Sequence, residues 1–442
     1  MSGEHLNRVL SIAFAVSGIA WMCSYIALLE PGFLIGEILW ILALVSLPIG
    51  GWFASCWKAS TWKSASAVGL VSSLINLMIL GSLLGKDIGE QDLLFITLSI
   101  LAVIFITVIL STLGIFIKLN NFVYKLKPPS WLSFFGFTVA GITFFMIVSG
   151  GIVTGLEVGL AVPDWPNSYG HNMLLYPLTE MKNDLNMGDE SLGIFYEHAH
   201  RLIGMLVGLA VLVFSWRVFV NRKGFIRLLA FAAFFIVCVQ GILGGLRVTE
   251  VNTFIGVFHG VLGQIFFSLL ILISVFLSSL WCKSIIKTNK ITGTDVFLAS
   301  GLVLISVIQL ILGTSYRQIS SDSTFSESFY NLFLLAHVLN SFVVLLLSIY
   351  IGIRMASFKE VKQISIVGKV LLSLVLFQFL GGILALTVVL IRKTEHIPKW
   401  EVLFTSVHQS SGALFLSTSL ITFFVVCKFF NGSNFVFSGM RK

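Results

Sequence analysis

The stretch YEHAHRLIGMLVGLAVLVFSW (196–216) starts with titratable side chains and continues as an apolar run long enough to cross a bilayer. His200 lies about two helical turns inside the apolar segment at about 193–219, where an ionisable side chain is costly and needs a functional reason. Three other apolar segments carry a histidine at a similar depth from the corresponding end, namely His259, His337 and His408. Four histidines at one level indicate two bis-histidine haem sites, because imidazole is a common axial ligand of haem iron.

The rest of the chain is also built for a membrane. It has 442 residues, of which 57% are hydrophobic and only 11% are charged, and its mean hydropathy is +0.98. Every backbone polar group in a bilayer must be satisfied internally, so long apolar runs are expected to be helices. We identify twelve such runs, at about 9–29, 33–57, 65–85, 93–118, 132–155, 193–219, 225–247, 253–281, 294–316, 329–354, 366–391 and 402–430.

The net charge of +8 does not indicate nucleic acid as a partner, because the basic residues gather in alternate loops. This alternation follows the positive-inside rule and predicts that both termini are cytoplasmic and that the 156–192 loop lies outside. The loop at 392–401 fits the pattern least. No transit peptide is visible, which favours a bacterial plasma membrane. The five cysteines contain no CxxC pair and do not indicate a disulfide or zinc site.

A weak internal repeat organises the chain after residue 127. The segments QGILGGLRVT (240–249) and QFLGGILALT (378–387) lie at similar distances after His200 and His337. Repeats of this kind indicate duplicated units, here two tandem four-helix bundles that enter the membrane in the same orientation. The predicted class is therefore an all-α polytopic membrane protein with this parallel repeat preceded by four extra transmembrane helices.

Three domains follow from this organisation. Residues 1–127 form a four-span region in which we find no candidate chemistry, and packing or assembly is its expected role. Residues 128–283 form the first four-helix half, with His200 and His259. Residues 284–442 form the second half, with His337 and His408.

Glu197 lies three residues before His200, on the same helix face. A carboxyl group near a haem edge can transfer a proton or stabilise positive charge. The alternative is that Glu197 only pairs with Arg201, four residues later. His198 points away from this face and is a weaker candidate ligand.

Three arginines lie at span ends on the predicted outer side, namely Arg201, Arg247 and Arg317. Arginine binds carboxylates in a bidentate manner, so these residues are candidates for the haem propionates. Snorkelling of arginine toward the membrane interface is the alternative. The outer loop carries PDWPNSYG (163–170), whose Asp164 and Trp165 could form a lid over a haem or anchor the loop at the interface.

Over about residues 130–430 the chain resembles the haem A synthase family. The resemblance rests on GGIVTG (150–155), GLAVPDWPNSYG (159–170), the E-x-x-H-R motif that begins at Glu197, QGILGGLRVT, QFLGG (378–382) and the four histidines. It implies a membrane protein of two four-helix halves that oxidises a ring methyl of haem O to the formyl group of haem A for cytochrome oxidase assembly.

The resemblance also implies roles for individual residues. His200 and His259 would flank the substrate haem O, with Glu197 catalytic, and His337 and His408 would ligate haem b. The implied partners are haem O, the farnesyltransferase that makes it, an electron donor and the lipid membrane.

Two features depart from this family. Many bacterial members carry a cysteine pair around the DWP motif, whereas this chain has Val162 and Ser168 in those places, so a thiol role in the loop is absent. The four N-terminal spans lie outside the family core.

Two other functions remain open on the residues alone. An electron-transfer cytochrome usually places its haems near opposite faces of the membrane, which the single histidine level disfavours. A haem exporter or cytochrome c assembly factor usually has a tryptophan-rich outer motif, and this loop contains only Trp165.

Overall fold

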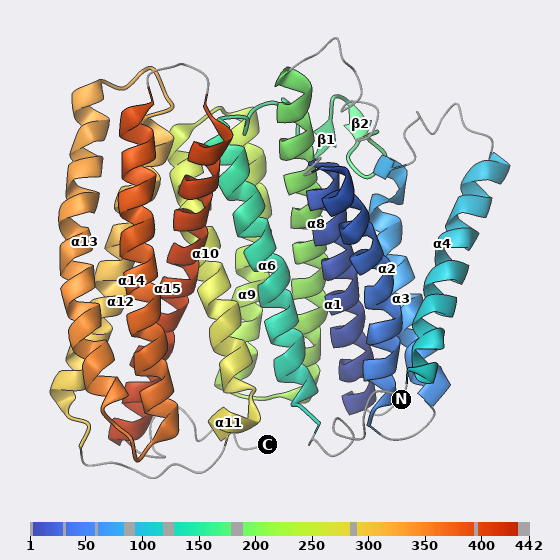
Figure 1. Ribbon diagram of the computed structural model, residues 1–442, viewed down its shortest axis with the longest axis horizontal. Coiled ribbons are helices and arrows are strands. Elements are labelled where there is room, and N and C mark those ends of the chain that lie inside the picture. Colours follow the sequence, from blue (N-terminus) through green and yellow to red (C-terminus); the bar gives the residue numbers. More distant parts are fainter. Residues whose placement is uncertain are drawn as a thin grey trace. The chain divides into compact units, whose positions relative to one another are not determined.

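The computed structural model describes residues 3–29, 32–57, 61–83, 93–117, 128–177, 189–282, 290–392 and 397–431. Within these ranges the chain is helical apart from its turns and one two-stranded sheet (Figure 1). Twelve of the described helices are long and apolar enough to cross a membrane. The twelve predicted spans and the all-α polytopic class are therefore confirmed.

In chain order the elements are α1 (Gly3–Leu28), α2 (Phe33–Ser55), α3 (Thr61–Leu83), α4 (Leu93–Leu113), η2 (Gly114–Phe116), α6 (Trp131–Gly155), β1 (Asn167–Ser168), β2 (His171–Asn172), α8 (Asp189–Asn221), α9 (Phe225–Thr249), α10 (Thr253–Phe276), α11 (Ser279–Cys282), α12 (Gly293–Ile319), α13 (Glu327–Ala356), α14 (Lys362–Ile391) and α15 (Lys399–Asn431).

The first span begins earlier than the sequence predicts. The expected start near residue 9 left Arg8 and His5 outside the membrane, but α1 begins at Gly3 and the candidate span includes both residues. The guanidinium of Arg8 is buried and donates to the carbonyl oxygen of Trp57 and to Ser64 Oγ. These two hydrogen bonds lower the cost of burying the cation inside the first helix.

By its internal contacts the chain divides into two compact units. Unit 1 comprises residues 1–146, 161–221 and 274–281, and unit 2 comprises residues 147–160, 222–273 and 282–442. The predicted domain boundaries at 127/128 and 283/284 fall at or inside segments outside the described residues. The three-part organisation therefore stays a prediction.

In unit 1 the four N-terminal helices pack closely on one another, and α1 also packs on α8. A Cβ atom on Gly51 of α2 would lie only 1.8 Å from the carbonyl oxygen of Ser111 on α4, so only glycine allows this approach. Arg217 of α8 is buried and donates to Asn7 Oδ1 on α1 at 2.7 Å. The N-terminal region is thus fixed to α8 by a buried polar contact as well as by apolar packing.

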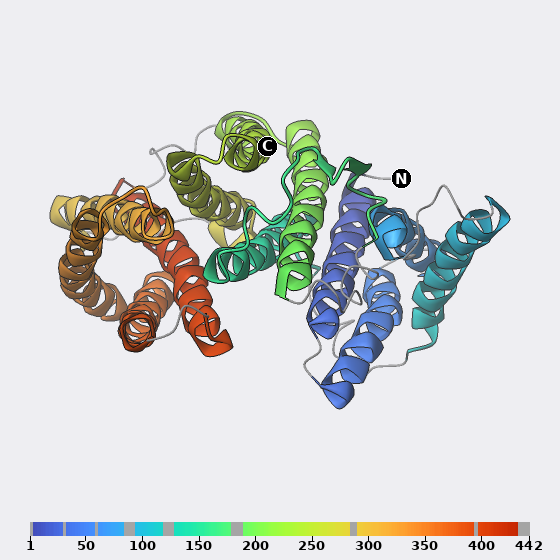
Figure 2. The ribbon, with the colours of Figure 1, turned by 90° about the horizontal axis from the view of Figure 1, so that it is seen from above.

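In unit 2 the helices α12, α13, α14 and α15 form a closed four-helix bundle. Each packs on the next along the chain, and α15 returns to pack on α12. Figure 2 shows these helices around a ring, coloured from yellow to red in chain order. At the start of α12 the side chain of Thr292 accepts the Asp295 N–H and the carboxylate of Asp295 accepts the Thr292 N–H, a capping box that fixes where the helix begins. The bundle places His337 of α13 and His408 of α15 in one unit.

Candidate functional site

His337 and His408 face each other inside the α12–α15 bundle. Their ring centroids are 6.3 Å apart and the ring planes are nearly perpendicular, at 86°. Two metal–imidazole bonds of about 2 Å each, plus about 1 Å from each ligating nitrogen to its ring centre, give about 6 Å between centroids across one metal ion. The pair therefore has the spacing that two axial ligands of one haem iron require.

The tautomer of His337 also suits a haem ligand. Its Nδ1–H donates to the backbone carbonyl oxygen of Gln309 at 3.0 Å, because a carbonyl oxygen can only accept. The lone pair of this neutral imidazole is then on Nε2, which lies 3.2 Å from the side-chain amide nitrogen of Gln309. Metal-binding histidines commonly donate their second nitrogen in this way, which fixes the ring orientation.

Glutamine side chains hold three of the four histidine segments. In each case the amide nitrogen donates to the backbone carbonyl oxygen of a histidine on the next long helix. The pairs are Gln240 with His259 at 3.1 Å, Gln309 with His337 at 3.0 Å, and Gln378 with His408 at 3.1 Å. A side-chain amide bound to the histidine backbone fixes the distance between the two helices and the position of the imidazole along the helix axis.

Four residues after each glutamine, a glycine lies against the imidazole. A Cβ atom would stand 3.3 Å from Cε1 of His259 at Gly244, 2.7 Å from Cε1 of His337 at Gly313, and 2.9 Å from Cε1 of His408 at Gly382. Any larger residue at these glycines would push the ring or the helix away. Read as Q-x-x-x-G, the sequence repeat therefore places a glutamine and a glycine at equivalent positions in all three helix pairs.

Sequence analysis missed several of these residues. Gln309 was not recognised, although its Q-x-x-x-G spacing repeats that of Gln240 and Gln378. Asn340 was also missed, and its side-chain amide donates to Gln309 Oε1 at 2.7 Å. Ser411 likewise donates to Gln378 Oε1. These contacts orient the two glutamines, and only the repeated spacing could have indicated them.

Two further imidazole nitrogens are buried. Nδ1 of His259 and Nδ1 of His408 have no hydrogen-bond partner among the described residues. An unsatisfied buried nitrogen is costly, and neither ring has the Nδ1 hydrogen bond that orients His337. A haem fits this donor set because the porphyrin supplies the other iron ligands. Within the described part of the chain, no group of three or more His, Cys, Asp or Glu side chains is arranged to hold a metal ion.

In unit 1, Glu197 and Arg201 of α8 bind the loop at residues 161–177, which we call the strap. Oε2 of Glu197 accepts a hydrogen bond from the Val162 N–H at 2.8 Å. Oε1 of Glu197 accepts one from Arg201 Nη2 at 2.6 Å. Arg201 also donates to the carbonyl oxygens of Val162, Asp164 and Asn167. The predicted Glu197–Arg201 ion pair is thus present, but it also holds the strap against α8.

The lid residues Asp164 and Trp165 differ in their surroundings. The Asp164 carboxylate accepts the N–H groups of Tyr169 and Gly170, both at 2.7 Å, and so closes the turn of the strap. Partial burial alone would raise the pKa of Asp164, but these two N–H groups and the charge of Arg201 outweigh it and lower the pKa. Trp165 is 41% exposed.

His198 is fully buried beneath the strap. Its Nδ1 lies 3.0 Å from Ser168 Oγ, and its ring centroid lies 4.9 Å from that of Tyr176. Burial raises the pKa of Tyr176, which keeps the phenol neutral. Val162 and Ser168 stand where many family members have cysteines. They reach Glu197 and His198, so the strap is held here by hydrogen bonds.

The remaining arginines lie in unit 2. Arg317 donates to the carbonyl oxygens of Thr154 at 2.7 Å and Gly155 at 3.2 Å, and its Nη1 lies 3.4 Å from Glu157 Oε1. The guanidinium of Arg247 lies so close to Gly159 that a Cβ there would be 2.9 Å from Nη1. Both arginines therefore have protein contacts, and their propionate role stays a prediction.

Glu401 is another residue that sequence analysis missed. It is buried on α15, seven residues before His408 and hence on the same helix face. Its Oε2 lies 3.3 Å from Arg392 Nε, an electrostatic contact whose geometry is not that of a hydrogen bond. The sequence places residue 401 in the loop at 392–401, just before the predicted span at 402–430. It therefore did not suggest a buried carboxylate at this position.

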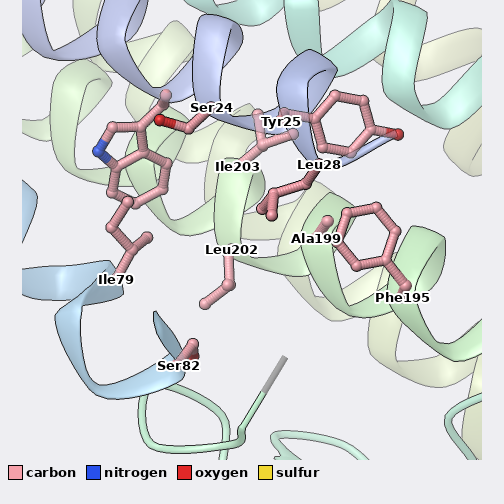
Figure 3. Close-up of a pocket in the computed structure, with 10 residues that line it drawn as sticks. Ser24, Tyr25, Leu28, Ile79, Ser82, Phe195, Ala199, Leu202 and Ile203 are labelled. Carbon is pink, nitrogen blue, oxygen red and sulfur yellow. The ribbon is translucent and has the colours of Figure 1, made fainter. Parts of the chain in front are cut away.

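A pocket in unit 1 lies beside the histidine segment of α8. It is lined by α1, α3 and α8, and Figure 3 shows Tyr25, Phe195 and Leu202 among its apolar residues. The rings of Tyr25 and Phe195 are stacked at 6.0 Å. One side of α8 near His200 is therefore covered by the N-terminal helices.

His200 belongs to unit 1 and His259 to unit 2, so their pairing stays a prediction. A family model, COX15-CtaA, described as cytochrome oxidase assembly protein, matches residues 131–420. The match covers about two thirds of the chain and leaves out the N-terminal helices α1–α4. No single curated protein matches the chain.

Proposed function

We propose, because this chain belongs to the COX15-CtaA family of cytochrome oxidase assembly proteins, that it converts haem O to haem A by oxidising a ring methyl to a formyl group. The observation that carries the proposal is the His337–His408 pair, whose 6.3 Å separation suits a haem iron. A cytochrome oxidase assembly protein with two buried histidines at this separation fits an enzyme that modifies haem for that oxidase.

The second half would hold haem b, with His337 and His408 as axial ligands. Haem b would supply one-electron chemistry when bound. The protein would hold the two imidazoles in position. The amides of Gln309 and Gln378 bind the histidine backbones, and Gly313 and Gly382 lie against the rings.

The first half would bind the substrate haem O, with His200 and His259 as its ligands. Arg201, Arg247 and Arg317 are the candidates for its propionates, and all three also contact protein groups. Asp164 and Trp165 would act as a lid that limits access of water to the reacting methyl group.

Glu197 would be the catalytic residue of this half. Its carboxylate is oriented by Arg201 and by the Val162 N–H, and it lies on the His200 helix. A carboxylate so placed can take a proton from an attacking water or stabilise positive charge that develops at the methyl carbon. Oxidation of the methyl to the formyl group removes four electrons. If water supplies the oxygen, an electron acceptor must take all four; if dioxygen supplies it, each of two hydroxylations consumes one dioxygen and two electrons from a donor and releases one water.

The proposed setting is a bacterial plasma membrane, with both termini cytoplasmic and the haem sites toward the outer face. The twelve candidate spans support a multi-pass membrane protein. The proposed partners are the farnesyltransferase that makes haem O and an electron donor for the redox cycle.

Haem extraction from the purified protein tests the function. We expect haem b together with haem O, its hydroxylated intermediate or haem A, each identified by mass. Haem O supplied to the membranes should be converted to haem A. Haem b alone, with no conversion of added haem O, would contradict the proposal and favour an electron-transfer cytochrome, for which the His337–His408 pair is also suitable.

A further inference from the structure

Glu401 is a buried acidic side chain that the proposed reaction does not use. It lies in the first turn of α15, inside the last of the twelve candidate spans, and its side chain is 3% exposed. An ionisable residue inside a membrane span is costly and commonly marks a route for protons or ions. His408 follows seven residues later on the same helix face, about 10 Å along the helix axis.

A cluster of charges surrounds Glu401 at this end of the bundle, and all of it belongs to unit 2. Oε2 of Glu401 lies 3.3 Å from Nε of Arg392, which follows the last residue of α14. Nη1 of Arg317, near the end of α12, lies 3.4 Å from Oε1 of Glu157. The charges of Arg392, Arg317 and Glu157 act on the Glu401 carboxylate, and the phenol of Tyr316 on α12 also interacts with it.

The charges of this cluster balance only when Glu401 is ionised. Two arginines and two carboxylates then sum to zero, and a proton on Glu401 would leave one net positive charge. Reduction of an iron held by His408 would add one negative charge about two helical turns away. Because like charges disfavour each other in a medium of low dielectric constant, reduction would raise the affinity of a nearby buried carboxylate for a proton.

The two carboxylates of the cluster are not equally suited to this role. Glu157 lies beyond the end of α6 and its side chain is 40% exposed, so water and salt screen its charge. Glu401 is buried, and its Oε2 accepts no hydrogen bond from the part of the chain that the structure describes. Arg392, at 25% exposure, joins the buried carboxylate to the protein surface.

We propose that Glu401 takes up a proton when the iron of a haem held by His337 and His408 is reduced, and releases it when that iron is oxidised. One electron passes from an external one-electron reductant to the iron. One proton passes from an acid in the aqueous phase to the Glu401 carboxylate, and no other bond changes. The inference rests on the haem b site of the proposed function, but it does not depend on the conversion of haem O.

A redox titration of the full-length, haem-loaded protein in detergent tests the inference. The midpoint potential is measured with dithionite and mediators from about pH 5 to about pH 9, the range in which a buried glutamate can titrate. The haem in question is the component that His337→Ala removes.

The wild-type potential should fall with rising pH between two plateaus, because Glu401 is neutral at the acidic end and charged at the alkaline end. One charge at about 10 Å, with an effective dielectric constant of about 20, changes a proton affinity about tenfold. The whole fall should therefore correspond to about a tenfold change in the reduction equilibrium. A potential that does not change with pH in the wild type would overturn the proposal.

Glu401→Gln should keep the haem spectrum and abolish the fall. Glu157→Gln is the matched control, since it removes the partly exposed carboxylate of the same cluster and should keep the fall. Residues 393–396 lie outside the described residues, and their sequence contains Glu395 and His396. Glu395→Gln and His396→Asn should also keep the fall. A fall that persists in Glu401→Gln, or that disappears in either of these last two variants, would overturn the proposal.

Arg392→Gln keeps the test valid if Glu401→Gln does not retain haem. This variant removes a cation that lies beside the carboxylate, so Glu401 should bind its proton more readily and the fall should move to higher pH. A fall that stays in the wild-type pH range would overturn the proposal. If Glu401 were only an ion-pair partner of Arg392, both variants would lower stability without changing the fall.

The two proposals fail separately. A protein that shows the Glu401-dependent fall but does not convert haem O would contradict the proposed activity and leave the proton uptake intact. A protein that converts haem O but has a potential independent of pH would contradict only the role of Glu401.

Discussion

Two regions of the molecule differ in the kind of interaction that holds them. One is the interior of the α12–α15 bundle around His337 and His408, and the other is the end of α8 around Glu197, which the strap covers. The first is built from neutral groups, with amides on histidine carbonyls and glycines against the rings. The second is built from charges, with Glu197, Arg201 and Asp164 tying a loop to a helix. In the proposed function the neutral contacts belong to the haem b site, and the charged contacts belong to the substrate site.

Replacing one of the four candidate ligand histidines should have the largest effect, because it should separate the two proposed haem sites. We expect His337→Ala or His408→Ala to lose haem b while some haem O remains bound. His200→Ala or His259→Ala should abolish conversion and leave haem b in place. Haem content by mass and the pyridine haemochrome spectrum measure both outcomes. Loss of all haem from every variant would instead indicate one shared site or misfolding.

Replacing the charge of Glu197 should have the next largest effect. Glu197→Gln removes the proton acceptor, and general acid–base groups commonly contribute about 10²- to 10⁴-fold to a rate. We expect turnover to fall by that order with haem binding retained, and haem O or the hydroxylated intermediate should accumulate.

Asp164→Asn is the matched control for Glu197→Gln. It weakens the strap turn that Tyr169 and Gly170 close but leaves the Glu197 carboxylate intact. Equal losses of turnover per folded protein in the two variants would mean that Glu197, like Asp164, acts through the strap.

A glycine substitution beside His337 should test how much the neutral contacts of the bundle contribute to haem b binding. A Cβ at Gly313 would stand 2.7 Å from Cε1 of His337. Forcing extra volume into a packed site costs about 1–3 kcal/mol. Gly313→Ala should therefore lower haem b occupancy and shift its absorption spectrum. Gly301→Ala is the control on the same helix, because a Cβ at Gly301 meets nothing within 4 Å.

The smallest effect should be the pH dependence of the strap. The pKa of Asp164 lies below its ordinary value of 3.8 because its N–H partners outweigh partial burial. A carboxyl group with a lowered pKa stabilises the folded strap above the ordinary pKa, and this contribution is lost as pH falls through the lowered value. Amide hydrogen exchange at 162–170, corrected for intrinsic rates, should stay constant from pH 7 to about pH 5 and rise only below about pH 4.

Asp164→Asn should remove this acid-dependent step and lower protection at every pH. A step that persists in the variant would assign the pH dependence to another group.

How far the sequence predicted the site varies from residue to residue. The four histidines and Glu197 stand out because titratable side chains are rare in apolar segments. Gln309 carries no charge and is marked only by its spacing to Gly313, which repeats that of Gln240 to Gly244. Gly244 and Gly382 were visible as glycines, but their contact with an imidazole was not.

The sequence by itself determined the twelve membrane helices, the histidines and the family, because apolar length and residue type are local properties. The tertiary structure decided which faces meet. Each glutamine is 19 to 30 residues from the histidine that it holds. The rotation of a membrane helix about its axis is set by packing against its neighbours, so no single segment can specify which histidine an amide reaches.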